Sequence, residues 1–242
     1  MKRILAVAAV VVLAAIVALW MMFQRIPEWY APPEIAPHEI QAVKNDFAQT
    51  EVDLSKRLNA AEADDSFEFR LTQDQINAWL AVRGEIWPLS RKWLPPYLEQ
   101  PMVVLDRDGI RVAALLTHQS LRAVVSLRVE VRAEPDGLFV RLAEVAAGNL
   151  PIPRSQVRKF LKRLDRKFWP MGAHLPGQIG PHRLPSLGNI LEGIRLPNTW
   201  IWMNGKQPFR ITSIDLEPGQ VRIGIEPLPR STLQEGAHQS RR

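Results

Sequence analysis

The hydrophobic pattern of the chain is most extreme at its N-terminus. Lys2 and Arg3 precede an uncharged, apolar run over residues 4–23. A helix of this length spans the roughly 30 Å hydrocarbon layer of a bilayer, where backbone amides must be satisfied internally. The pattern therefore predicts a transmembrane anchor over residues 1–23. Because only Arg25 follows the run closely, we expect the short N-terminus in the cytoplasm and the rest of the chain outside.

A cleaved signal peptide is the alternative interpretation of this segment. Signal peptides have an apolar stretch of about 7–15 residues and small residues at the cleavage site. Here the run is longer, and residues 20–23 at its end are bulky. The sequence therefore favours an uncleaved anchor.

A proline-rich segment and then a helix are predicted after the anchor. Residues 24–37 contain four prolines, which is typical of a stiff linker that lifts a domain off the membrane. Over residues 38–62, apolar side chains recur at steps of three and four, with charged side chains opposite them. This spacing predicts a helix that packs on the domain core or, alternatively, binds a partner.

A strand and a capped helix are predicted next. Residues 67–71 alternate apolar and polar side chains, as a half-buried strand does. Thr72 and Gln75 have the spacing of a capping box, so a helix should begin there and end near Arg83. Residues 85–101 mix tryptophan with proline, which predicts a packed surface loop or, alternatively, a lid or groove wall.

Residues 102–150 show the alternation of apolar and polar side chains that is typical of β-strands. Turn sequences such as Asp108-Gly109 separate strands predicted at 102–106, 110–118 and 121–133. The last of these strands places apolar side chains on one face and charged side chains on the other. The pattern predicts an antiparallel meander with one apolar and one charged face.

The C-terminal part begins with a basic helix predicted over residues 154–168. It carries seven basic residues against one acid, around an apolar stripe. Further on, a short helix is expected at 186–193. The remaining predicted segments are strands at 199–204, 208–217 and 220–226 and a disordered tail at 230–242.

Together these elements predict an α+β fold. We expect one curved antiparallel sheet packed with helices over residues 38–229, preceded by a single transmembrane helix. The chain has no cysteine, which excludes disulfides, thiol catalysis and cysteine-ligated metals. A net charge of +6 suits an anionic membrane surface or envelope polymer, and no nucleic-acid motif is present.

No catalytic or metal-binding motif emerges from the sequence. The five histidines are scattered, without the spacing of a zinc site. The paired carboxylates at Asp64-Asp65 and at Asp106 and Asp108 suit solvated positions. We therefore expect no enzyme activity, no metal and no cofactor.

Several motifs occur in an order that resembles the YpmS-type bacterial membrane proteins. They are Phe69-x-Leu71-Thr72-x-x-x-Ile76-Asn77, the Asp108-Gly109 hairpin and Gly148-x-Leu150-Pro151-Ile152-Pro153 before a helix. That family has an N-terminal anchor and an exported domain of unknown function. The first motif is also similar to exported lipid-binding proteins with a curved antiparallel sheet. The resemblance implies an envelope-facing domain and a hydrophobic ligand, and it transfers no catalytic residue.

Two groups of candidate site residues follow. The candidates for a ligand groove are Asn77, Trp79, Trp87 and Trp93, although Asn77 also suits a buried amide bonded to backbone. The candidates for contact with a membrane surface are Arg154, Arg158, Lys159, Lys162, Arg163, Arg166 and Lys167. The alternative for this helix is packing on the core with a solvated basic face.

The sequence thus predicts a non-enzymatic, membrane-anchored envelope protein that binds a lipid or other apolar molecule. Its partners would be the membrane itself and such a lipid. The alternative function is an envelope scaffold that binds another membrane or exported protein.

Overall fold

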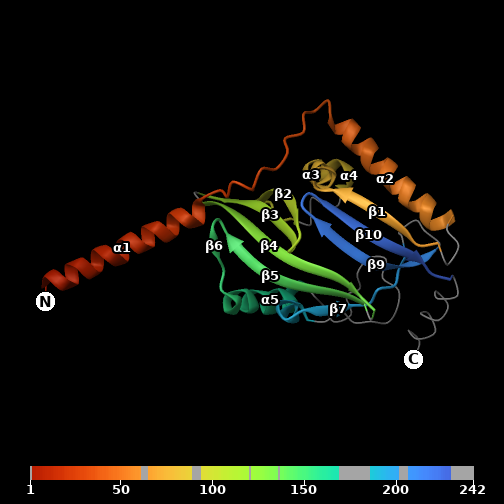
Figure 1. The fold of residues 1–242 in the computed structure, drawn as a ribbon. Helices are drawn as coiled ribbons and strands as arrows, with labels where there is room; N and C mark the ends of the chain where they lie inside the picture. Colours follow the sequence, from red (N-terminus) through yellow and green to blue (C-terminus); the bar gives the residue numbers. More distant parts are fainter. Residues whose placement is uncertain are drawn as a thin grey trace.

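The computed structural model describes residues 2–60, 65–88, 94–119, 121–135, 137–168, 186–201 and 207–229. Its helices are α1 (Lys2–Gln24), α2 (Ile40–Ala60), α3 (Gln73–Ala81), α4 (Arg83–Ile86), α5 (Arg154–Phe168) and the 3-10 helix η2 (Leu187–Leu191). Its strands are β1 (Phe67–Thr72), β2 (Leu98–Asp106), β3 (Gly109–His118), β4 (Leu121–Glu134), β5 (Gly137–Ala147), β6 (Leu150–Pro151), β7 (Ile194–Leu196), β8 (Trp200–Ile201), β9 (Pro208–Glu217) and β10 (Gln220–Pro227). The fold is α+β with antiparallel sheets, as predicted (Figure 1).

The strands form two sheets, so the prediction of a single sheet is wrong. One sheet has the order β1-β10-β9-β8, and the other has the order β2-β3-β4-β5-β6, with β7 also paired to β5. The strand that opens the domain pairs with the last strand, with Phe67 opposite Ile225. Alternation along a strand identifies the strand but not its partner, which is why the sequence did not reveal this division.

Helix α2 covers the four-stranded sheet. Leu54 and Leu58 are buried against Phe209 and Ile225, which come from the two central strands of that sheet. The expected core-packing role of this helix is therefore what the structure shows. The capping box is also present, since the Thr72 hydroxyl accepts a hydrogen bond from the Gln75 amide at 3.2 Å.

Helix α1 ends against the six-stranded sheet. The Asn149 amide in the turn between β5 and β6 donates a 3.0 Å hydrogen bond to the carbonyl of Met22. Gly148 in the same turn has φ +57, and a side chain there would collide with the carbonyl oxygens of Met22 and Phe23. Within the described residues, no helix is long and apolar enough to cross a membrane.

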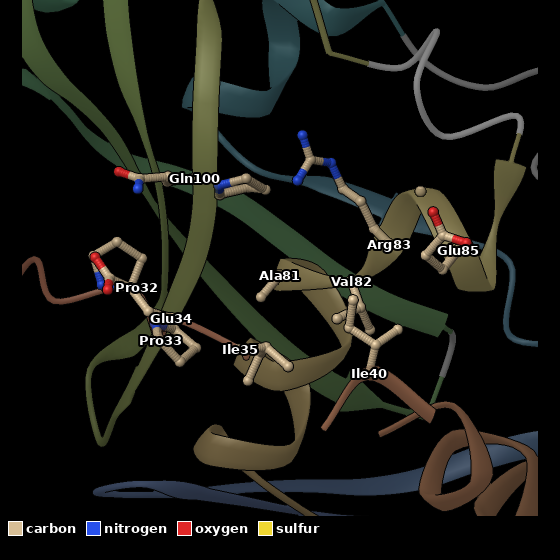
Figure 2. Close-up of a pocket in the computed structure, with 12 residues that line it drawn as sticks. Pro32, Pro33, Glu34, Ile35, Ile40, Ala81, Val82, Arg83, Glu85 and Gln100 are labelled. Carbon is tan, nitrogen blue, oxygen red and sulfur yellow. The ribbon is translucent and has the colours of Figure 1, made fainter. Parts of the chain in front are cut away.

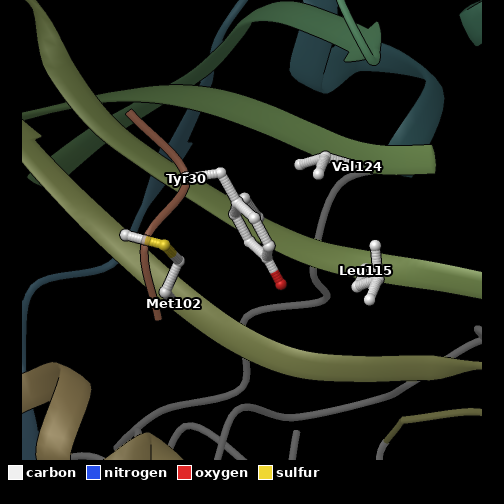
Figure 3. Close-up of a cluster of buried hydrophobic side chains, with 5 residues drawn as sticks. Tyr30, Met102, Leu115 and Val124 are labelled. Carbon is white, nitrogen blue, oxygen red and sulfur yellow. The ribbon is translucent and has the colours of Figure 1, made fainter. Parts of the chain in front are cut away.

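The proline-rich segment over residues 25–39, here called the strap, runs back across the six-stranded sheet. Tyr30 is only 7% exposed and packs with Met102, Leu115 and Val124 (Figure 3). Its hydroxyl donates to the carbonyl of Gln100 at 2.6 Å. The segment predicted as a linker between the anchor and the domain therefore packs on the domain itself, because the Tyr30 side chain attaches it to the sheet.

The strap also changes the predicted faces of β4. Val124 and Ser126 lie on the side expected to be charged, yet both are buried. Val124 has no exposed surface because Tyr30 covers it. The sheet therefore has apolar contacts on both faces near the start of β4.

Candidate functional site

The edge of β2 is the first feature that positions the candidate residues. β2 is an end strand of its sheet, where backbone groups lack a neighbouring strand. The Asn77 side chain donates to the carbonyl of Val103 at 2.9 Å and accepts from its amide at 2.7 Å. Gln73 accepts from the amide of Leu105, and the Gly219 amide donates to the carbonyl of Leu105. Asn77 thus takes the structural role that was its alternative interpretation.

Two of the tryptophan candidates lie in an aromatic cluster between α2 and the α3–α4 segment. The rings of Trp79 and Trp87 both meet the ring of Phe47 edge to face, with centroids 5.3 and 5.0 Å away. The indole nitrogen of Trp79 donates to Asp46 at 2.9 Å. Trp93 lies outside the described residues. The cluster joins helices and does not line the pocket described next.

A pocket of about 640 Å³ lies between the strap, the α3–α4 segment and β2. This volume is within the range of small-molecule sites, which is roughly 300–1,000 Å³. Figure 2 shows Ile35, Ile40 and Val82 gathered on one side, with Gln100 on the facing strand. The lining residues are Pro32, Pro33, Glu34, Ile35, Ile40, Ala81, Val82, Arg83, Gly84, Glu85, Gln100 and Pro101.

The wall that β2 contributes to this pocket is conformationally strained. Gln100 has φ +47, a left-handed conformation that is uncommon outside glycine. It sits in a bulge of β2, where the pairing register with β3 shifts between Glu99 and Met102. Bulges and positive-φ residues of this kind gather at binding sites, where the surrounding structure must hold them. Here the Tyr30 hydroxyl holds the carbonyl of Gln100 in place.

The pocket is lined by both charged and apolar side chains, with Glu34 on the strap as well as Arg83 and Glu85 on α4. Arg83 and Glu85 belong to the turn of α4, and Arg83 also donates to the carbonyl of Leu80 at 3.2 Å. Ile35, Ile40 and Val82 supply apolar surface to the same pocket. Next to the pocket, burial raises the pKa of the Tyr30 hydroxyl, which therefore remains a hydrogen-bond donor at neutral pH. The arrangement suits a ligand with an apolar body and a polar end.

The second group of candidates lies on α5. Val157 is buried with Leu142 and Leu191, and Leu161 packs against this cluster, so the apolar stripe covers the core as its alternative interpretation expected. Five basic residues with described side chains, Arg154, Arg158, Lys159, Lys162 and Arg163, are exposed. The side chains of Arg166 and Lys167 lie outside the described part. The spacing also predicts Phe160 on this apolar stripe, three residues after Val157, but its side chain is 58% exposed.

The strap pocket was missed by the sequence analysis. The sequence predicts a linker for its prolines and Ile35 and a loop for Gln100. The combination of a proline-rich segment with apolar Ile35 and aromatic Tyr30 was the available signal, because a free spacer has no need of large apolar side chains. Nothing in the sequence indicated which surface these side chains would meet.

Comparisons with known proteins add no family assignment. No protein-family model matches the chain, and no curated protein matches it. Within the described residues, no three histidine, aspartate or glutamate side chains are grouped to hold a metal ion.

Proposed function

We propose that this protein is a membrane-anchored, non-enzymatic envelope protein that binds a lipid or other apolar molecule near the membrane surface. The observation that carries the proposal is the pocket beneath the strap, whose apolar wall is left unfilled by the protein's own side chains. A pocket with apolar walls and a few polar groups at one side is the usual form of a site for an amphiphilic ligand.

The proposed attachment to a membrane is supported by the surface of α1. Its side chains from residue 11 onward are almost entirely apolar, and Val11, Leu13, Ile16, Leu19 and Met21 are all exposed. Such a continuous apolar surface is unfavourable in water and indicates a site of membrane or protein contact. The residues before it, Lys2 and Arg3, suit the cytoplasmic side of a membrane.

Native mass spectrometry of the full chain, purified from membranes in mild detergent, tests the ligand. We expect a reproducible extra mass that yields lipid on extraction. Ala81 is exposed and lines the pocket, so Ala81→Trp should occupy the space without disturbing the core. This variant should lose the extra mass.

Ala48→Trp is the matched control. Ala48 is also an exposed helical alanine, but it lies on α2 and outside the pocket lining. It should keep the extra mass. A clean apo mass for the unmodified chain, or an extra mass that survives Ala81→Trp, contradicts ligand binding in this pocket.

An envelope scaffold is the second candidate function, and one observation favours it. Val112 and Leu127 are opposite each other on β3 and β4 and are each 38% exposed. They lie on the face opposite Tyr30 and form an apolar patch that suits a protein contact. A photo-crosslinking residue at Leu127 should capture one defined envelope protein if this function is correct, and a photo-crosslinking residue at exposed Val52 should not.

A further inference from the structure

The exposed basic face of α5 also carries the exposed aromatic ring of Phe160. Among the described residues, Arg158 pairs with Glu192, whereas no carboxylate lies within ion-pair distance of Lys159 or Arg163. Phe160 lies between these two cations in sequence, and Arg163 is one turn further along the same face. An exposed aromatic ring flanked by cations is the composition of helices that lie in a lipid headgroup layer.

We propose that α5 lies on an anionic lipid surface, with Phe160 inserted between headgroups and Lys159 and Arg163 on their phosphates. This inference rests on the proposed membrane attachment and adds a second contact to it. Complementary charge favours lipid as the occupant, because each basic residue near an anionic surface strengthens association by roughly fivefold.

The docking of α1 brings α5 to the same end of the molecule. The Asn149 amide donates to the carbonyl of Met22 near the end of α1, and β6 begins directly after this turn at Leu150. α5 then starts at Arg154, only three residues beyond the end of β6. At about 3.3 Å per residue, the start of α5 is within roughly 10 Å of the end of β6. Figure 1 shows β6 near the end of α1, with the chain running from β6 into α5.

This arrangement differs from a domain on a flexible tether. Tyr30 fastens the strap to the sheet, and the Asn149 hydrogen bond fastens the end of α1. A membrane that contains α1 therefore meets a restricted set of surfaces of the domain. α5 presents one such surface: Val157 and Leu161 pack on the core, whereas the Phe160 ring is 58% exposed.

A single introduced cysteine tests the inference, since the chain has none of its own. The full chain carrying Phe160→Cys is labelled with an environment-sensitive fluorophore and reconstituted into vesicles. The vesicles contain equal parts of phosphatidylglycerol and phosphatidylcholine, with a spin-labelled lipid as quencher. We expect quenching of the label at residue 160 in these vesicles and little quenching in phosphatidylcholine alone. The matched label at Val52→Cys, an exposed apolar position on α2, should not be quenched in either.

Charge-reversal variants distinguish the contact of α5 with lipid from the insertion of α1 into the membrane. Lys159→Glu with Arg163→Glu should weaken docking of the label by about 30-fold or more. Lys44→Glu with Lys56→Glu makes the same change of net charge on α2 and should leave quenching unchanged. A chain that floats with the vesicles but has an unquenched label at residue 160 contradicts this inference alone. A chain that does not float contradicts the membrane attachment and this inference together.

Discussion

The side-chain amide of Asn77 pairs with the backbone of Val103 in both directions, at 2.9 and 2.7 Å. A residue on a helix thereby takes the place of the missing strand beside β2. The contact fixes α3 against the six-stranded sheet, and α3 leads directly into the residues that line the strap pocket.

Asn77→Ala should be strongly destabilising. The substitution leaves a buried donor and a buried acceptor on Val103 without partners, which should cost about 2–4 kcal/mol. Urea unfolding of the full chain in detergent measures the loss. Asn59→Ala is the control, because the Asn59 amide is exposed and bonds only within its own helical turn, so the change should be within about 0.5 kcal/mol. Equal losses for the two variants would contradict the bridging role of Asn77.

Gly148→Ala should detach the end of α1 from the sheet. The added methyl group collides with the carbonyls of Met22 and Phe23, and the φ of +57 is unfavourable for alanine. We expect a broader, more mobile spectrum from a spin label placed near the base of α1. Gly219→Ala also substitutes a positive-φ glycine but has open space around it, so the label's spectrum should be unchanged.

Tyr30→Phe should weaken the strap while keeping the aromatic packing. Loss of the hydroxyl removes the hydrogen bond to Gln100, which is worth about 1 kcal/mol. Since Gln100 lines the pocket, the extra mass in native mass spectrometry should also decrease. An unchanged unfolding midpoint together with unchanged ligand mass would show that the bulge holds its shape without Tyr30.

Alkaline pH should act on the same residue. Burial raises the pKa of the Tyr30 hydroxyl in the folded state above 10.0. Because the hydroxyl ionises less readily in the folded state than in the unfolded state, its contribution to the free energy of unfolding is fully present below pH 10. This contribution is lost as the pH rises through the folded-state pKa. Unfolding of the unmodified chain should become easier above pH 10, and Tyr30→Phe should flatten that slope.

Acid pH should act on the pair of Glu130 and Arg141. The guanidinium donates hydrogen bonds to the carboxylate, at 2.7 Å for the shortest, and lowers the pKa of Glu130 below 4.5. The lowered pKa gives stability that is present above pH 4.5 and is lost as the pH falls through the folded-state pKa. Unfolding curves for the unmodified chain and Glu130→Gln should therefore converge in acid. Curves that stay parallel down to pH 2 would contradict this, and the pair would then contribute no pH dependence.

Local patterns in the sequence were sufficient for most of the elements. The predicted helix over 154–168 has the observed bounds of α5, and the Thr72 capping box forms as its spacing requires. These features depend on neighbours three or four positions away, which the sequence displays directly. The predicted short helix at 186–193 appears as η2, and β7, which was not predicted, pairs with β5 just after it.

The tertiary structure decided everything that depends on partners far apart in the chain. The sequence by itself determined the apolar N-terminal helix, the α+β class and the basic character of α5. Only the fold joined β1 to β10, brought Tyr30 over Val124, and formed a pocket between the strap, the α3–α4 segment and Gln100. The physical reason is that hydrophobic burial is non-directional. An apolar residue in the sequence indicates that it will be buried, but it does not indicate which residues will pack against it.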